Sequence, residues 1–151
     1  MQTALIERTL PTAADHAARF ARQREADRTA TAEDYVELIA DLLREEGEAR
    51  AVDLARRMGV SQATVTATVG RLQRDGLVET KPYRGLFLTE EGRRMASIAK
   101  ARHELVVHFL LALGLDRETA EADAEGLEHH VSGKALEAFA RFLAGRQAAS
   151  S

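Results

Sequence analysis

Apolar residues recur at helical spacing along most of the chain, and glycines end these stretches. From 35 to 42 the apolar positions are three or four residues apart, which predicts a helix that opens at Asp34 and ends at Gly47. A second, shorter helix is expected at 51–58, where Gly59 follows an apolar pattern. The spacing therefore predicts a protein built mainly from helices.

The middle of the chain combines a helix with a hairpin signal. Ser61 is a favourable N-cap residue for a helix that begins at Gln62. This helix is expected to end near Asp75, because Gly76 follows. Two β-prone runs then flank the turn sequence KPYRG at 81–85, which predicts a hairpin. Helix, short helix, tight turn, helix and hairpin, in this order, are typical of a winged helix-turn-helix domain.

The last third of the chain is again helical. A long helical pattern runs from Glu90 to about Leu113 and stops at Gly114, and two further helices are expected near 116–131 and 132–145. The fold class expected is mainly α with a small β-hairpin wing, in which a winged helix-turn-helix domain precedes a helical domain.

Domain boundaries follow from these elements. Residues 1–31 contain a short helical pattern at 15–28 and look like an appended N-terminal arm. The winged helix-turn-helix domain is expected at 32–92, and the helical domain at 93–147. The sequence assigns no role to the arm.

Composition narrows the function classes. The 151 residues contain no cysteine, which excludes a disulfide framework, a cysteine-based zinc finger and a thiol nucleophile. The longest apolar run, at 105–115, is interrupted by His108 and is too short to span a bilayer. The N-terminus shows no signal-peptide pattern. We therefore expect a cytoplasmic protein with no membrane partner.

Charge is distributed unevenly along the chain. The formal net charge is −3, but residues 49–84 carry seven basic and three acidic side chains, whereas residues 1–48 carry six basic and eleven acidic ones. A basic segment inside an acidic chain indicates phosphate binding. Chance fluctuation in a charge-rich sequence is the alternative.

The outer face of the helix at 62–75 and the tip of the hairpin carry groups that suit DNA. Amide and guanidinium groups hydrogen-bond base edges, methyl groups contact thymine, and cationic groups contact phosphates. The candidate DNA-binding residues are Ser61, Gln62, Ala63, Thr64, Thr66, Ala67, Arg71, Arg74, Lys81, Tyr83 and Arg84. The alternative is that these threonines are ordinary surface residues of a helix weakened by β-branching.

Candidate metal ligands cluster in EGLEHH, at 125–130. On a helix, Glu125, Glu128 and His129 would share one face, since they are spaced i, i+3 and i+4. His103 lies on the apolar face of the long helix, where a hydrogen-bonded core histidine is the commoner explanation. Asp34 and Glu37 are also spaced i, i+3. Their place in a first helical turn is equally explained by the helix dipole.

Two metalloenzyme classes are excluded by spacing. HELVVH at 103–108 resembles a zinc-protease motif, but its histidines are i, i+5 and cannot share a face. The chain has no Glu-x-x-His pair of the kind that di-iron carboxylate enzymes use.

Five blocks together resemble the diphtheria-toxin-repressor family, in its manganese-transport-regulator branch. They are EDYVELI at 33–39, the helix-turn-helix at 51–77, YRGLFLTEEG at 83–92, RHELVVHFLLALG at 102–114 and DAEGLEHHVS at 123–132. The resemblance implies a winged-helix DNA-binding domain followed by a helical dimerisation domain, with divalent metal bound between them. The partners implied are double-stranded operator DNA and a second copy of the chain, and no small-molecule substrate is expected. The metal ligands implied are Asp34, Glu37, His103, Glu125, Glu128 and His129.

This ligand set favours manganese. Four carboxylates and two imidazoles, without a thiolate or thioether, suit Mn²⁺ and tolerate Fe²⁺. Six side chains suffice for two ions that share carboxylate bridges. Iron-responsive members of the family have Met and Cys where this chain has Glu37 and Glu128, which also favours manganese.

The function expected is therefore Mn²⁺-dependent repression of manganese-uptake genes by a metal-loaded homodimer. Three alternatives stay open at this stage: an Fe²⁺-responsive regulator of the same family, a winged-helix regulator of a non-metal signal, and a metal-dependent hydrolase or metal store. For the hydrolase we find no nucleophile, base or phosphate-binding loop in the sequence.

Overall fold

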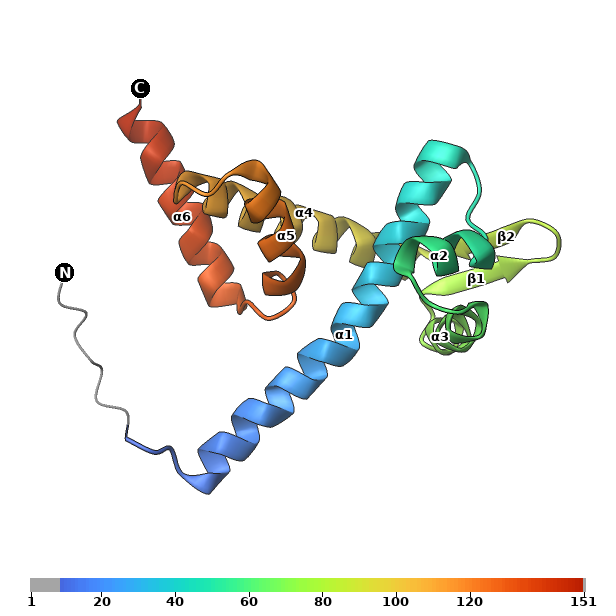
Figure 1. Ribbon diagram of the computed structural model, residues 1–151, viewed down its shortest axis with the longest axis horizontal. Helices are drawn as coiled ribbons and strands as arrows, with labels where there is room; N and C mark the ends of the chain where they lie inside the picture. Colours follow the sequence, from blue (N-terminus) through green and yellow to red (C-terminus); the bar gives the residue numbers. More distant parts are fainter. Residues whose placement is uncertain (1–8, 151) are drawn as a thin grey trace.

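The computed structural model describes residues 9–150, and Figure 1 shows two lobes joined by a long helix. The helices are α1 (Ala13–Glu46), α2 (Ala51–Met58), α3 (Gln62–Arg74), α4 (Glu90–Ala112), α5 (Arg117–Leu127) and α6 (Gly133–Ala149). The strands are β1 (Val78–Lys81) and β2 (Gly85–Leu88). The C-terminal half of α1, α2, α3 and the hairpin form one lobe, and α4 runs from it to a second lobe with α5 and α6 (Figure 1). The fold class expected from the sequence is confirmed.

One prediction about α1 is wrong. Separate helices were expected at 15–28 and from Asp34 onward, but a single helix of 34 residues runs through both. Its length is roughly 50 Å. Neither glycine nor proline interrupts it, and Thr12 caps its start by accepting a hydrogen bond from the backbone N–H of Asp15 at 3.1 Å. Asp34 and Glu37 therefore lie deep inside a helix, where the helix dipole does not explain them.

The core of the first lobe follows the apolar pattern of the sequence. Val36 and Ile39 of α1 are fully buried against Leu54 of α2 and against Val65 and Leu72 of α3. The apolar residues of α3, Val65, Val69 and Leu72, are thus inside, and its polar face is left to solvent. Together these contacts tie the C-terminal half of α1 to the helix-turn-helix.

The hairpin closes this lobe and sets the direction of α4. Strands β1 and β2 are antiparallel, with Val78 opposite Leu88. Thr89 caps α4 and donates its hydroxyl hydrogen bond to the Gly76 carbonyl at 2.6 Å. A Cβ at Gly92 would lie 2.0 Å from the Leu77 carbonyl oxygen, so only glycine allows α4 to approach the chain this closely.

The second lobe has a small core of its own. Val106, Val107 and Leu110 of α4 are buried with Ala120 and Ala124 of α5. Helix α6 contributes no buried residue and packs against α4 through a stacked aromatic pair, Phe109 and Phe139, whose ring centroids are 3.9 Å apart. No helix in the described part of the chain has both the length and the apolar character needed to cross a membrane.

Candidate metal centre and DNA-reading surface

Two clusters of carboxylates and imidazoles lie where α1 faces the end of α5. Asp34, Glu128 and His129 form the first cluster, and His103, Glu125 and Glu128 form the second. Within each cluster the candidate ligand atoms all lie within 4.8 Å of one another. Glu128 belongs to both clusters and is only 1% exposed, so its carboxylate joins them.

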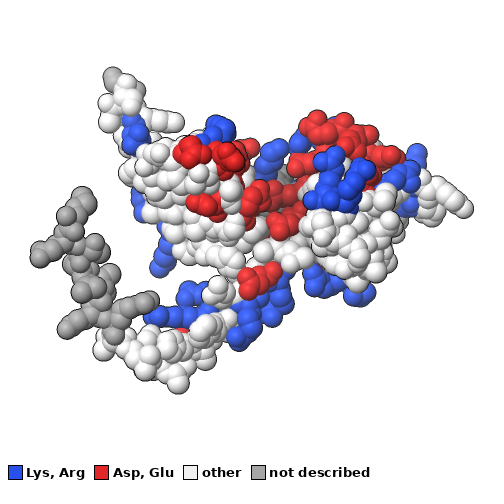
Figure 2. Space-filling view, viewed as in Figure 1, with Lys and Arg blue, Asp and Glu red and all other residues white. Residues whose placement is uncertain are grey.

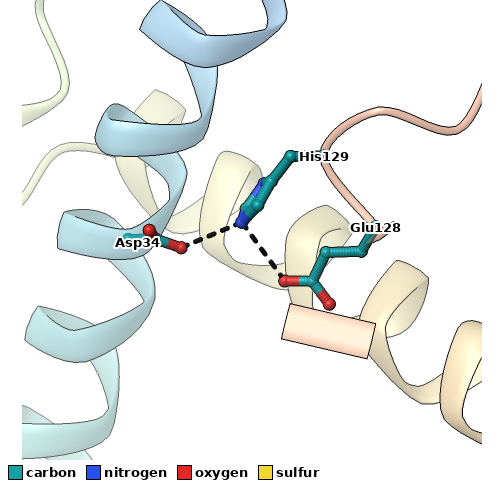
Figure 3. Close-up of side chains that lie close together, drawn as sticks. All are labelled: Asp34, Glu128 and His129. Atoms are coloured by element: carbon teal, nitrogen blue, oxygen red, sulfur yellow. Dashed lines mark ion pairs between the residues drawn. The ribbon is translucent and has the colours of Figure 1, made fainter. Parts of the chain in front are cut away.

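The imidazole of His129 points from the turn after α5 toward α1 (Figure 3). Its Nδ1 lies 3.0 Å from Glu33 Oε2, while its Nε2 lies 3.1 Å from Asp34 Oδ1 and 3.5 Å from Glu128 Oε1. Because an ionised carboxylate only accepts hydrogen bonds, Nδ1 donates its proton to Glu33, and in the neutral ring Nε2 then carries the lone pair. That Nε2 is buried and makes no hydrogen bond within residues 9–150. A lone pair that faces two carboxylates is the arrangement that a cation would complete.

Glu33 lies behind the first cluster and was not among the residues predicted from the sequence. It is 7% exposed and forms an ion pair with Arg102 of α4 while accepting the hydrogen bond from His129. A carboxylate behind the outer nitrogen of a metal-binding histidine fixes the tautomer and the ring orientation.

His103 is held in the same way on the other side of Glu128. Its Nε2 lies 2.9 Å from Glu121 Oε2, and its Nδ1 lies 2.5 Å from Glu128 Oε2 and 3.8 Å from Glu125 Oε1. Glu121 was not predicted either. Burial opposes the charged form of His103, but hydrogen bonds that its ring donates to Glu121 and Glu128 outweigh this effect and raise the His103 pKa.

Glu37 belongs to neither cluster by distance. It is half-buried on α1, and burial, followed by the charges of Glu128 and Asp34, raises its pKa to about 7. Burial also raises the pKa values of Asp34 and Glu128. The structure thus brings five of the six expected ligands into two clusters and leaves the sixth within their electrostatic field.

The end of α5 departs from the prediction. A helix was expected to continue to about residue 131, with Glu125 and His129 on one face, but α5 ends at Leu127. Gly126 weakens the last turn, and Ser132 caps the next helix by accepting from the backbone N–H of Ala135. The intervening turn directs Glu128 and His129 toward α1, so Glu125 and His129 lie in different clusters.

These residues fit a divalent cation. Burying several carboxylates and imidazoles beside one another is costly unless a positive charge compensates them. The donors are oxygens and imidazole nitrogens, a set suited to Mn²⁺ and to Fe²⁺. The unpartnered Nε2 of His129 is the most direct sign, because a buried nitrogen without a hydrogen bond needs another partner.

The surface expected to read DNA is exposed throughout. Ser61 caps α3 and accepts a hydrogen bond from the backbone N–H of Thr64 at 3.1 Å. Tyr83 stands at the tip of the hairpin with positive φ and is 99% exposed. The exposed side chains include every candidate: Ser61, Gln62, Ala63, Thr64, Thr66, Ala67, Arg71, Arg74, Lys81, Tyr83 and Arg84.

Two family models match most of the chain. Residues 27–86 match the iron dependent repressor, N-terminal DNA binding domain, and residues 89–148 match the iron dependent repressor, metal binding and dimerisation domain. The transcriptional regulator MntR of Escherichia coli O157:H7 is 52% identical over 128 residues, which cover 85% of this chain and 83% of that protein. The HTH-type transcriptional regulator MntR of Bacillus subtilis (strain 168) is 38% identical over 109 residues, covering 72% and 77%.

Solved structures agree with this relationship. The manganese regulator SloR superposes with a TM-score of 0.66 at 31% identity, over 74% of this chain and 53% of that one. The apo form of the manganese-activated repressor ScaR superposes with a TM-score of 0.65 at 29% identity, over 73% and 53%. The chain spans about half the length of these two proteins. It belongs to the iron-dependent repressor family, also called the diphtheria-toxin-repressor family, in its manganese-transport-regulator branch, a family of metal-dependent, DNA-binding transcriptional regulators and not of enzymes.

Proposed function

We propose that this protein is a manganese sensor that, as a metal-loaded homodimer, binds operator DNA in the cytoplasm and represses manganese-uptake genes. The observation that carries the proposal is the pair of clusters that share Glu128, since they connect α1 to the second lobe. Manganese-responsive relatives support the choice of metal. We assign residues 32–92 to DNA binding and 93–147 to metal binding and dimerisation, with 1–31 as an N-terminal arm.

Two ions per chain are proposed. Asp34, Glu128 and His129 would hold one, and His103, Glu125 and Glu128 would hold the other, with Glu128 shared. Glu37 is the remaining proposed ligand, because it lies in the field of both clusters. When bound, Mn²⁺ supplies the positive charge that neutralises these carboxylates.

The proposed switch follows from where the ligands sit. Asp34 and Glu37 are on α1, whose C-terminal half packs on the DNA-reading helices, while His103, Glu128 and His129 belong to the second lobe. Without a cation, the carboxylates of α1 and α5 repel one another and leave the angle between the lobes loose. Once neutralised, they hold α1 against α5, and the two reading helices of a dimer are fixed at the spacing of successive major grooves.

The DNA contacts proposed are the exposed residues of α3 and the hairpin. Gln62, Thr66 and Arg71 would contact base edges, and Arg74, Lys81 and Arg84 would contact phosphates. Alanine substitution of a base-reading arginine is expected to cost about 1–3 kcal/mol of discrimination between sequences.

The test of the metal site is a Mn²⁺ titration followed by the EPR signal of the free ion. We expect uptake to approach two ions per chain in the wild type and to be strongly reduced in Glu128→Gln, because this change removes the charge shared by both clusters. Glu118→Gln, which alters an exposed carboxylate of α5, the helix that ends just before Glu128, is the matched control and should bind like the wild type. Absence of uptake at micromolar Mn²⁺ would refute the manganese assignment, and anaerobic Fe²⁺ competition then tests the iron-responsive alternative.

A further inference from the structure

The N-terminal half of α1 extends away from both lobes (Figure 1). From Ala13 to Ala32 no side chain of this segment is buried, and the first buried residue is Glu33. Most of the segment precedes residue 27, where the match to the DNA-binding family model begins. An exposed helix of this length is marginal on its own, although here it is continuous with a packed one. The residue types on the surface of this half of α1 therefore indicate which kind of partner binds it.

Arginines are the prominent side chains of this extension. Arg19, Arg22, Arg24 and Arg28 lie within ten residues, whereas the acidic residues of the same stretch are Glu25 and Asp27. Figure 2 shows basic side chains along the extension, while acidic side chains gather over the two lobes above it. A basic surface set apart from acidic lobes is suited to a polyanion.

The four arginines divide between two faces of the helix. Arg28 lines a groove of about 470 Å³ with Arg71 of α3, and Arg24 lies one turn earlier on the same face as Arg28. Arg19 and Arg22 line a different groove, with His130 and with Ser132, on the side of the second lobe. The face that carries Arg24 and Arg28 is thus the face on the side of α3.

The guanidinium groups on this side differ in whether they are already paired within the chain. Arg28 pairs with Glu25, and Glu25, Asp75 and Glu91 also line its groove. Within residues 9–150, Arg24 forms no ion pair. Arg71 and Arg74 of α3, which are proposed DNA contacts, form none in this part of the chain either. Cationic groups without an ion pair therefore continue from α3 to Arg24 of α1, while Arg28 would exchange Glu25 for a phosphate.

The residues that precede Arg24 on this face are small, except Phe20, which lies one turn before Arg24 and is 60% exposed. Ala21 and Ala17 lie three and seven positions before it, so the backbone of a ligand can approach the helix closely. Small residues with interspersed arginines match the surface of a phosphodiester chain, whereas an interface between copies would need an apolar core larger than Phe20, the one large apolar side chain of residues 13–28.

We propose that the N-terminal extension of α1, residues 13–28, is an additional DNA-binding element whose Arg24 and Arg28 contact backbone phosphates next to the half-site contacted by α3. This inference rests on the proposed function, since it requires that α3 binds DNA. It adds phosphate contacts outside the winged helix-turn-helix. Such contacts strengthen binding and fix its register without reading base sequence.

The test compares two double variants that remove the same charge from the same helix. The probe is a duplex of roughly 40 base pairs, longer than two half-sites one helical turn apart, selected from a random pool by the Mn²⁺-loaded wild type. The dissociation constant is measured against salt concentration for the wild type, Arg24→Ala/Arg28→Ala and Arg19→Ala/Arg22→Ala. Alanine favours the helix, so both variants should fold, which circular dichroism verifies.

We expect Arg24→Ala/Arg28→Ala to reduce the slope of log K against log salt by about 2–4 per dimer, since each phosphate contact contributes roughly 0.9. Arg19→Ala/Arg22→Ala should reduce the slope by less than half as much. Equal reductions would overturn the proposal, because they would reflect diffuse charge, and so would an unchanged slope in both.

Sedimentation tests the alternative that a second copy of the chain, and not DNA, binds the face that carries Arg24 and Arg28. If Arg24→Ala/Arg28→Ala converts a dimer into monomers, the extension is an interface between copies of the chain and the proposal is wrong. If the wild type selects no DNA with or without Mn²⁺, the proposed function itself fails, and this inference fails with it.

Discussion

Replacing Glu33 by Gln tests whether the site depends on the carboxylate behind His129. Glu33 accepts the hydrogen bond from His129 Nδ1 and pairs with Arg102, and both interactions are buried. A glutamine keeps the size of the side chain and one oxygen but removes the charge. The imidazole then has only a neutral amide acceptor, which holds its Nε2 lone pair toward Asp34 and Glu128 less strongly than the carboxylate does.

The expected loss of metal affinity follows from the effect of comparable carboxylates in the metal sites of other proteins. Loss of a carboxylate behind a metal-binding histidine typically weakens metal binding by about 10–100-fold, which is roughly 1.4–2.7 kcal/mol. Since Glu33 is 7% exposed, solvent cannot substitute for it, and we expect a loss within this range. Arg102 also loses its partner, so the melting temperature of the metal-free protein should fall.

Glu121→Gln is the matched comparison, because Glu121 holds His103 Nε2 at 2.9 Å as Glu33 holds His129. Glu121 is half-exposed, so water replaces its carboxylate readily and a loss of less than about 10-fold is expected. The assay is competitive Mn²⁺ titration with a fluorescent chelator, together with thermal unfolding. Equal affinities for Glu33→Gln and the wild type, or a larger loss in Glu121→Gln, would refute the reasoning.

Three further predictions concern stability. Burial raises the pKa of Glu37 to about 7, so between pH 4.5 and 7 the metal-free native state binds more protons than the unfolded chain. The melting temperature of the metal-free protein should therefore fall as the pH rises from 5.5 to 8, and an increase would contradict this prediction. Gly92→Ala should destabilise the protein by on the order of 2–4 kcal/mol in urea unfolding, because its Cβ would meet the Leu77 carbonyl, whereas Gly145→Ala, with open space around it, should not. Phe139→Ala should cost about 2–4 kcal/mol by removing the ring stacked on Phe109, and Lys134→Ala in the same helix should cost little.

Periodicity predicted the elements whose ends carry local signals. Gly59 ends α2, Ser61 caps α3 and Thr89 caps α4, and each of these helices begins and ends within about two residues of the expected place. The continuous α1 was not predicted, because no residue between 28 and 34 forbids either a break between two helices or one uninterrupted helix. A polar, alanine-rich stretch has no apolar stripe, and only its continuity with a packed helix reveals it.

The members of the two clusters were predicted as metal ligands, whereas the side chains that support them were not. Glu125, Glu128 and His129 stand out by type and spacing, while Asp34 and His103 were named through the family resemblance. Glu33, Glu121 and Arg102 do not stand out, because carboxylates and arginines are common in this chain. Their roles arise from the way α1, α4 and α5 meet, which no local pattern encodes.

The coupling between metal and DNA is the central claim, and the most direct measurement is the affinity for the selected duplex with Mn²⁺ and with a chelator. The protein should bind the duplex about 5–150-fold more tightly with Mn²⁺ than with the chelator, which corresponds to a coupling free energy of roughly 1–3 kcal/mol. This difference should disappear in Glu128→Gln and persist in Glu118→Gln. Equal affinity in the two conditions for the wild type would contradict the account.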